Sequence, residues 1–127
     1  AGNRGAANAG YRGAANAGDC GAANAGDCGA ANAGNRGAAN AGYRGAANAG
    51  YRGAANAGER GAASVGKNGV AIAATQGKVK GQIGAVLVLV NRNNDGDVTN
   101  FAAKPVDNTT IKADTWYTLK DGEFVEV

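Results

Sequence analysis

A strict eight-residue repeat dominates the first half of the chain. The octad Gly-Ala-Ala-Asn-Ala-Gly-x-x begins at Gly5, recurs without a slip to the copy at Gly53, and then degenerates through residues 61–80. Six positions are fixed, whereas the seventh is Tyr, Asn, Asp or Glu and the eighth is Arg or Cys. Repetition at one short period indicates a stacked architecture, because each unit must present the same shape to the next.

Composition limits how this half can fold. Residues 1–64 contain no Val, Ile, Leu, Met, Phe or Trp, so the hydrophobic fraction of 44% is mostly alanine. Burying a Val or Leu side chain is worth roughly 1.5–3 kcal/mol, and an alanine methyl offers only a fraction of that. The repeats are therefore either a flexible Gly/Ala linker or a very thin structure held by backbone hydrogen bonds. A linker tolerates drift, so the six fixed positions favour order.

The period of eight selects one ordered structure. Collagen requires Gly at every third residue, a helix would carry two costly Gly per octad, and a coiled coil needs a large apolar seam. A short strand followed by a tight corner at Gly-x-Arg fits, with Gly expected to supply positive φ there. We predict an all-β protein. Residues 1–83 form a parallel β-solenoid with two octads per coil, and residues 84–127 form a small C-terminal β segment.

Strand alternation divides each octad between two faces. Gly, Ala and Ala at the first, third and fifth positions are uniformly small and are expected to face inward, which leaves Val70 and Ile72 facing outward. The asparagine at the fourth position is expected to form a stacking ladder, as amide side chains do in cross-β assemblies. The residues of this ladder are Asn8, Asn16, Asn24, Asn32, Asn40, Asn48 and Asn56.

The last 44 residues contain the bulky side chains and are expected to form two hairpins. Ala85–Val90 pairs with Asp97–Ala103 across the Asn-Asn-Asp-Gly turn at 93–96, and Pro105 ends the second strand. Thr115–Leu119 and Glu123–Val127 form the other hairpin around Lys-Asp-Gly. So small a unit is marginal alone, so we expect it to dock on the last coil as a cap, or to assemble with copies of itself.

Two stretches resemble known repeat families. Gly61-Ala-Ala-Ser-Val-Gly-Lys-Asn-Gly-Val-Ala-Ile-Ala73 resembles the head repeats of trimeric autotransporter adhesins, which form left-handed parallel β-rolls. The whole arrangement, ending in Lys112-Ala-Asp-Thr-Trp-Tyr-Thr-Leu-Lys-Asp-Gly-Glu-Phe-Val-Glu-Val127, resembles octapeptide-repeat proteins of gut bacteria and their phages. The resemblance implies a β-solenoid without an established activity, and the shorter period departs from the adhesin coil.

The chemistry in the sequence argues against an enzyme. There is no histidine, and no set of residues suggests a metal site or a cofactor. Cys20 and Cys28 lie one octad apart, which puts them at opposite corners of a coil, roughly 16 Å from each other. That separation is too long for an internal disulfide. In an oxidising setting each could cross-link neighbouring molecules, and two free surface thiols are the alternative.

Arginines and tyrosines recur at the corners. They could form a surface contact column for a polyanion, or a solvated edge that keeps rods soluble; the net charge of +3 favours the edge over nucleic-acid binding. No apolar run reaches the roughly 20 residues of a membrane-spanning helix. The corner residues are Arg4, Tyr11, Arg12, Arg36, Tyr43, Arg44, Tyr51, Arg52 and Arg60.

The sequence as a whole predicts a non-enzymatic structural protein. We expect a self-associating stalk or fibre subunit whose partners are copies of itself, in an extracellular fibre, at a cell surface or in a phage virion. The alternative is a binding module whose regular flat face recognises glycan, ice or another repetitive surface.

Overall fold

The computed structural model describes residues 6–10, 13–18, 21–92, 95, 98–120 and 123–126. The described residues form two seven-stranded sheets and no helix. The first sheet contains, in spatial order, β1 (Ala6–Ala9), β3 (Ala22–Ala25), β5 (Ala38–Asn40), β7 (Ala54–Ala57), β9 (Val70–Ala73), β11 (Val86–Arg92) and β12 (Val98–Pro105). The second contains β2 (Ala14–Asn16), β4 (Ala30–Asn32), β6 (Ala46–Ala49), β8 (Ala62–Val65), β10 (Lys78–Lys80), β13 (Tyr117–Lys120) and β14 (Glu123–Glu126).

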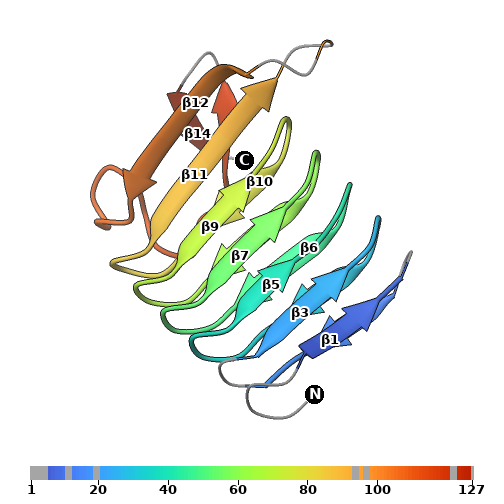
Figure 1. Cartoon of the computed structure of the whole chain (residues 1–127). Coiled ribbons are helices and arrows are strands. Elements are labelled where there is room, and N and C mark those ends of the chain that lie inside the picture. The colour runs from blue at the N-terminus through green and yellow to red at the C-terminus, as the bar shows by residue number, and fades with distance from the viewer. Residues whose placement is uncertain are drawn as a thin grey trace.

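The predicted parallel β-solenoid with two octads per coil is confirmed. Successive strands alternate between the two sheets, and each repeat strand pairs in parallel with the strand 16 residues further on. Ala6 pairs with Ala22, for example, and Asn40 with Asn56. The ten strands β1–β10 therefore make five flat coils, stacked one on the next from β1 towards β11 (Figure 1).

Alanine fills the interior between the two sheets. The third residue of each octad is completely buried in the central coils, as at Ala31, Ala47 and Ala63. The second and fourth residues point outward and are half-buried or exposed, and Val70 and Ile72 are among the half-buried ones. The predicted division of faces is thus confirmed, and bulky side chains enter the interior only from Val65 onward.

The glycine at the first position is required by space. A Cβ on Gly45 would lie 2.8 Å from the Ala41 Cβ and 2.9 Å from the carbonyl oxygen of Gly29 in the preceding coil. A Cβ on Gly37, Gly53 or Gly61 would lie 2.7–2.8 Å from the two equivalent atoms. Two sheets separated only by methyl groups leave no room for a side chain where the chain enters each strand.

The corner conformation differs from the prediction. We expected Gly to supply the positive φ, but among the described glycines only Gly84 has one, at 87°. In the repeats the eighth residue has it instead, as at Arg44 with φ 57°, although Arg is an unusual residue in this region. Gly45 N–H donates to the Gly42 carbonyl across the corner, 2.9 Å away, which is a β-turn whose third residue is left-handed.

Stacking explains why the eighth residue accepts this conformation. Its N–H donates to the carbonyl of the seventh residue one coil further on, from Arg36 to Tyr51 at 2.7 Å and from Arg44 to Glu59 at 2.9 Å. The corners thus carry a hydrogen-bonded ladder of their own, which offsets the backbone strain. In the degenerate octads the same position holds Asn68, a residue better suited to positive φ, and then Gln76.

The C-terminal segment closes both sheets at the far end of the solenoid (Figure 1). β12 pairs antiparallel with β11, while β13 pairs with β10 and β14 with β13, so the two predicted hairpins are present and docked. Pro105 is the last residue of β12, as expected. Under this cap lies a core of large buried side chains: Val79, Leu87, Leu89, Val106, Ile111, Tyr117 and Leu119.

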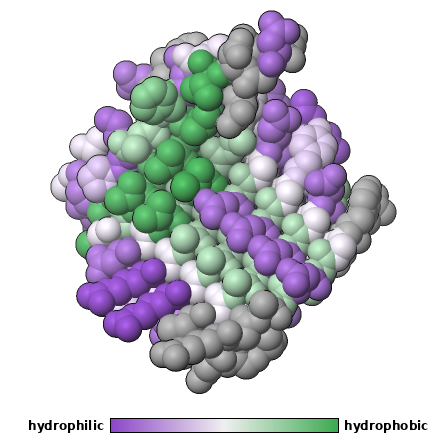
Figure 2. All heavy atoms as spheres, in the orientation of Figure 1, coloured by the Kyte–Doolittle hydropathy of each residue, from purple (hydrophilic) through white to green (hydrophobic). Residues whose placement is uncertain are grey.

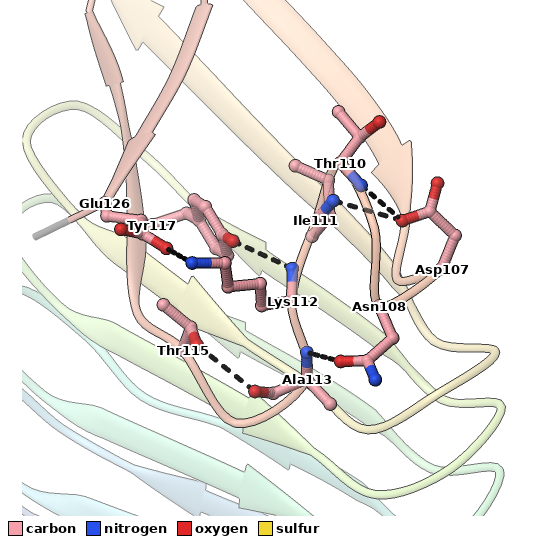
Figure 3. A network of polar contacts seen from close by, with 9 residues as sticks. All are labelled: Asp107, Asn108, Thr110, Ile111, Lys112, Ala113, Thr115, Tyr117 and Glu126. Atoms are coloured by element: carbon pink, nitrogen blue, oxygen red, sulfur yellow. Dashed lines mark hydrogen bonds and ion pairs between the residues drawn. The ribbon is translucent and has the colours of Figure 1, made fainter.

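A polar network orders the connection between β12 and β13 (Figure 3). The Asp107 carboxylate accepts the backbone N–H groups of Thr109 and Thr110 at 2.9 Å and of Ile111 at 3.1 Å. Lys112 N–H donates to the buried Tyr117 hydroxyl oxygen at 2.8 Å. The loop is therefore held at two points. Its first residues bind the Asp107 carboxylate, and Lys112 binds Tyr117 of the cap core.

The Asp107 turn should make the cap sensitive to acid. The hydrogen bonds from the Thr109 and Ile111 N–H groups lower the Asp107 pKa from 3.8 to about 2. Because the folded pKa is depressed, its stabilisation is fully present above the ordinary pKa and is lost as pH falls towards about 2.

We expect Asp107→Asn to remove this dependence. The melting temperature of the wild-type chain should fall more steeply between about pH 5 and pH 2 than that of Asp107→Asn, which keeps an acceptor oxygen but no titrating charge. Thermal unfolding by circular dichroism measures both curves. Parallel curves would contradict the assignment.

Candidate interaction surfaces

The asparagines form two hydrogen-bonded ladders on the outer faces of the solenoid. On the first sheet Asn24 Nδ2 donates to Asn8 Oδ1 at 2.9 Å, and the same bond repeats at 2.9 Å from Asn40 to Asn24 and at 2.8 Å from Asn56 to Asn40. On the second sheet Asn32 donates to Asn16 and Asn48 to Asn32, both at 2.9 Å. Two octads per coil thus divide the predicted column between the faces.

A substitution within one ladder should show what these bonds contribute. Asn40→Ala removes one donated and one accepted bond, whereas Asn56→Ala removes only the bond to Asn40, because Ile72 follows Asn56 in the register. At about 0.5–1.5 kcal/mol per hydrogen bond, we expect Asn40→Ala to cost roughly 1–3 kcal/mol, about twice the cost of Asn56→Ala. Chemical denaturation measures both, and equal costs would mean that the ladder contributes little.

The outer face of the first sheet becomes apolar beyond its ladder. Val70 and Ile72 on β9 are followed by Val86, Val88 and Val90 on β11, and the register stacks Val86 on Val70 and Val88 on Ile72. Figure 2 shows this face, on which a diagonal row of polar side chains between pale alanine rows runs into a contiguous hydrophobic area. We call these five residues, together with Phe101 of β12, the valine patch. Phe101 pairs with Val90 and is 72% exposed.

The second sheet carries charge and an aromatic ring at the corresponding place. Lys78 and Lys80 on β10 point outward, and their Nζ atoms lie 4.8 Å and 4.9 Å from the ring centroid of Trp116. Ammonium groups this close to an indole ring are held by cation–π attraction. The cluster attaches the cap to the last coil, and neither the local pattern nor the hairpin prediction indicated it.

The corner residues occupy two separate edges of the solenoid. Tyr43, Arg44 and Arg60 lie on one edge, while Arg36, Tyr51 and Arg52 lie on the other, because consecutive octads turn at opposite sides of a coil. The Arg44 guanidinium carbon is 5.2 Å from the centroid of its neighbouring Tyr43 ring, and that of Arg52 is 5.1 Å from Tyr51. The predicted contact column is thus two short, sparsely charged edges. Arg4, Tyr11 and Arg12 lie outside the described residues.

Of the two cysteines, the structure describes only Cys28. Cys28 is an exposed free thiol on a corner, with φ 60°. Cys20 lies outside the described residues. Any pairing of either thiol between molecules stays a prediction.

Comparison with known proteins gives no further guidance, since no family model, curated protein or solved structure matches this chain. Among the described residues there is no group of three His, Cys, Asp or Glu side chains that could hold a metal ion. The same residues include no helix long and apolar enough to span a membrane.

Sequence reasoning missed the valine patch as a surface feature. The assignment of faces predicted that Val70 and Ile72 point outward, but it did not connect them with other apolar residues. The signal that could have identified the patch is the register itself. Residues 16 apart stack, so Val70 with Val86 and Ile72 with Val88 must form one outward cluster.

Proposed function

We propose that this chain is a structural protein, a self-associating β-solenoid that serves as a stalk or fibre subunit. The observation that supports the proposal is the flat outer face of the first sheet, on which parallel strands repeat in one register. From β3 to Val90 of β11, the outward positions of these strands hold only Ala, Asn, Val and Ile. A regular surface without charge suits packing against another regular surface.

At the C-terminal end of the solenoid, the edge strands of both sheets disfavour pairing with another chain. β12 carries Lys104 and Pro105 at its edge, and β14 carries Glu123 and Glu126. Charged residues and proline on edge strands discourage strand pairing with another chain. Copies of the chain would then assemble side by side, in an extracellular fibre, a surface appendage or a phage particle.

Sedimentation and imaging of the full chain test the proposal. We expect species larger than a monomer in sedimentation velocity, with a proportion that rises with concentration, and elongated particles by negative-stain electron microscopy. A chain that stays monomeric at every concentration would contradict the proposal. If that monomer were retained on a polysaccharide column, it would favour the alternative of a binding module for a repetitive surface.

A further inference from the structure

We propose that the outer face of the first sheet, with the valine patch at its C-terminal end, is the surface through which two copies of this chain pack face to face. The inference rests on the proposed function and names the interface for it. In this arrangement the two solenoids lie side by side and run in the same direction, related by a twofold axis parallel to the stacking direction.

The patch is built as a continuous apolar surface. Its side chains lie on three neighbouring strands in the order fixed by the register. Val86 and Val88 of β11 stack on Val70 and Ile72 of β9, and Val90 pairs with Phe101 of β12. Phe101 is 72% exposed and Val86 is 37% exposed. A contiguous apolar area on a flat sheet is typical of a contact surface, whereas scattered exposed apolar residues are not.

The chemistry of the rest of the face selects a second copy as the partner. The outward strand positions from β3 to Val90 carry no charged residue, so a highly charged partner would gain no ion pairs there. Asn24 and Asn40 each use one N–H and one oxygen lone pair within the ladder. An amide has two N–H donors and two lone pairs, so the remaining groups are matched by an identical ladder.

A twofold axis along the stacking direction places the same feature of each copy opposite its equivalent in the other. It places coil opposite coil, so the valine patch meets its own equivalent and each ladder faces a ladder. The face spans seven strands at about 4.8 Å and roughly 16 Å along each strand. That is roughly 500 Å² per copy, and the total of about 1,000 Å² is the size at which specific interfaces begin.

The outer face of the second sheet lacks this self-complementarity. Its equivalent positions beyond the ladder are Lys78 and Lys80, which lie against Trp116. Two copies packed through this face along the same axis would bring lysines against lysines, and like charges brought together in an interface are strongly unfavourable. The two outer faces therefore differ in charge, and only the face of the first sheet can pack against itself without bringing lysines together.

Two variants of the full chain, each with a pair of added charges, test the interface. Val70→Lys with Ile72→Lys places on β9 the residues that β10 already carries at the same octad positions, so the coil should accept them. The control, Ala62→Glu with Ser64→Glu, adds two charges at the same two positions on β8 of the second sheet, where the register places them beside Lys78 and Lys80 and so avoids a like-charge contact. Sedimentation velocity and circular dichroism are measured for all three proteins.

We expect the β9 variant to dissociate, with a dissociation constant raised at least about tenfold and an unchanged circular dichroism spectrum, while the β8 variant assembles like the wild-type chain. A wild-type assembly that resists the β9 variant, or that is weakened equally by both variants, would overturn the interface and leave the proposed function standing. A wild-type chain that is always monomeric would overturn both.

Discussion

Replacing one interior alanine by leucine should unfold the coils around it, while the same replacement one residue earlier should be tolerated. Ala47 on β6 is fully buried and stacks between Ala31 and Ala63, whereas its neighbour Ala46 points outward and is half-buried. Overpacking normally costs about 1–3 kcal/mol, because the surroundings shift to make room. Here both sheets would have to separate, so we expect Ala47→Leu to reach or exceed the upper end of that range.

The matched variant Ala46→Leu isolates the effect of position. It adds the same volume to the same strand on the solvent side, where the octad of β9 naturally carries Val70. We expect its stability to lie within about 0.5 kcal/mol of the wild-type chain. Hydrogen exchange measures both variants, since in a stacked repeat the loss of protection should centre on β4, β6 and β8. Equal destabilisation by the two variants would mean that the interior is not the thin layer described above.

Truncating a leucine in the cap core should release the C-terminal segment before the solenoid unfolds. Leu87 is completely buried and belongs to β11, the strand that connects the last coil to β12. Replacing a buried leucine by alanine costs about 2–5 kcal/mol, because burial is lost and a cavity remains. Among the described residues, the core under the cap contains only six other large buried side chains, so we expect Leu87→Ala to make cap release a separate transition at lower denaturant concentration.

The single tryptophan of the chain reports this step. Trp116 lies against Lys78 and Lys80 of the last coil, so its fluorescence follows cap docking, whereas far-UV circular dichroism follows both sheets. The two signals should diverge in Leu87→Ala. In the control Val125→Ala, which truncates a side chain 41% exposed on β14, they should stay as close as in the wild-type chain. Coincident transitions with a cost below about 1 kcal/mol in Leu87→Ala would show that the cap does not depend on this core.

Much of the fold could be predicted from the eight-residue period of the sequence. Small residues at the first, third and fifth positions can face only a thin interior, and that requirement assigns the faces and the two ladders. The hairpins were also predictable, since Asn-Asn-Asp-Gly and Lys-Asp-Gly separate short apolar runs. In both cases the information is local, and each repeat strand meets the same neighbours.

The corner conformation and the outer surfaces were harder to predict from the sequence, for two different physical reasons. Glycine has two distinct uses, conformational freedom and small volume, and the sequence does not say which one a position needs. The octad uses Gly45 for its volume and leaves the left-handed conformation to Arg44. The contact of Trp116 with Lys78, and the joining of Val90 with Phe101 into one apolar area, depend on how the cap docks on the last coil.

The 16-residue coil also sets a rule for how such a chain can change in length. A tandem gain of two octads would insert one coil, extend the rod by about 4.8 Å and leave every later residue on its original face. A gain of one octad would turn everything after it through half a coil, so that the valine patch would continue the Asn16–Asn32–Asn48 ladder. Recombination between near-identical octads would therefore keep the valine patch on the same face only when an even number of octads is gained or lost. The length of such a chain is expected to change by pairs of octads and not by single octads.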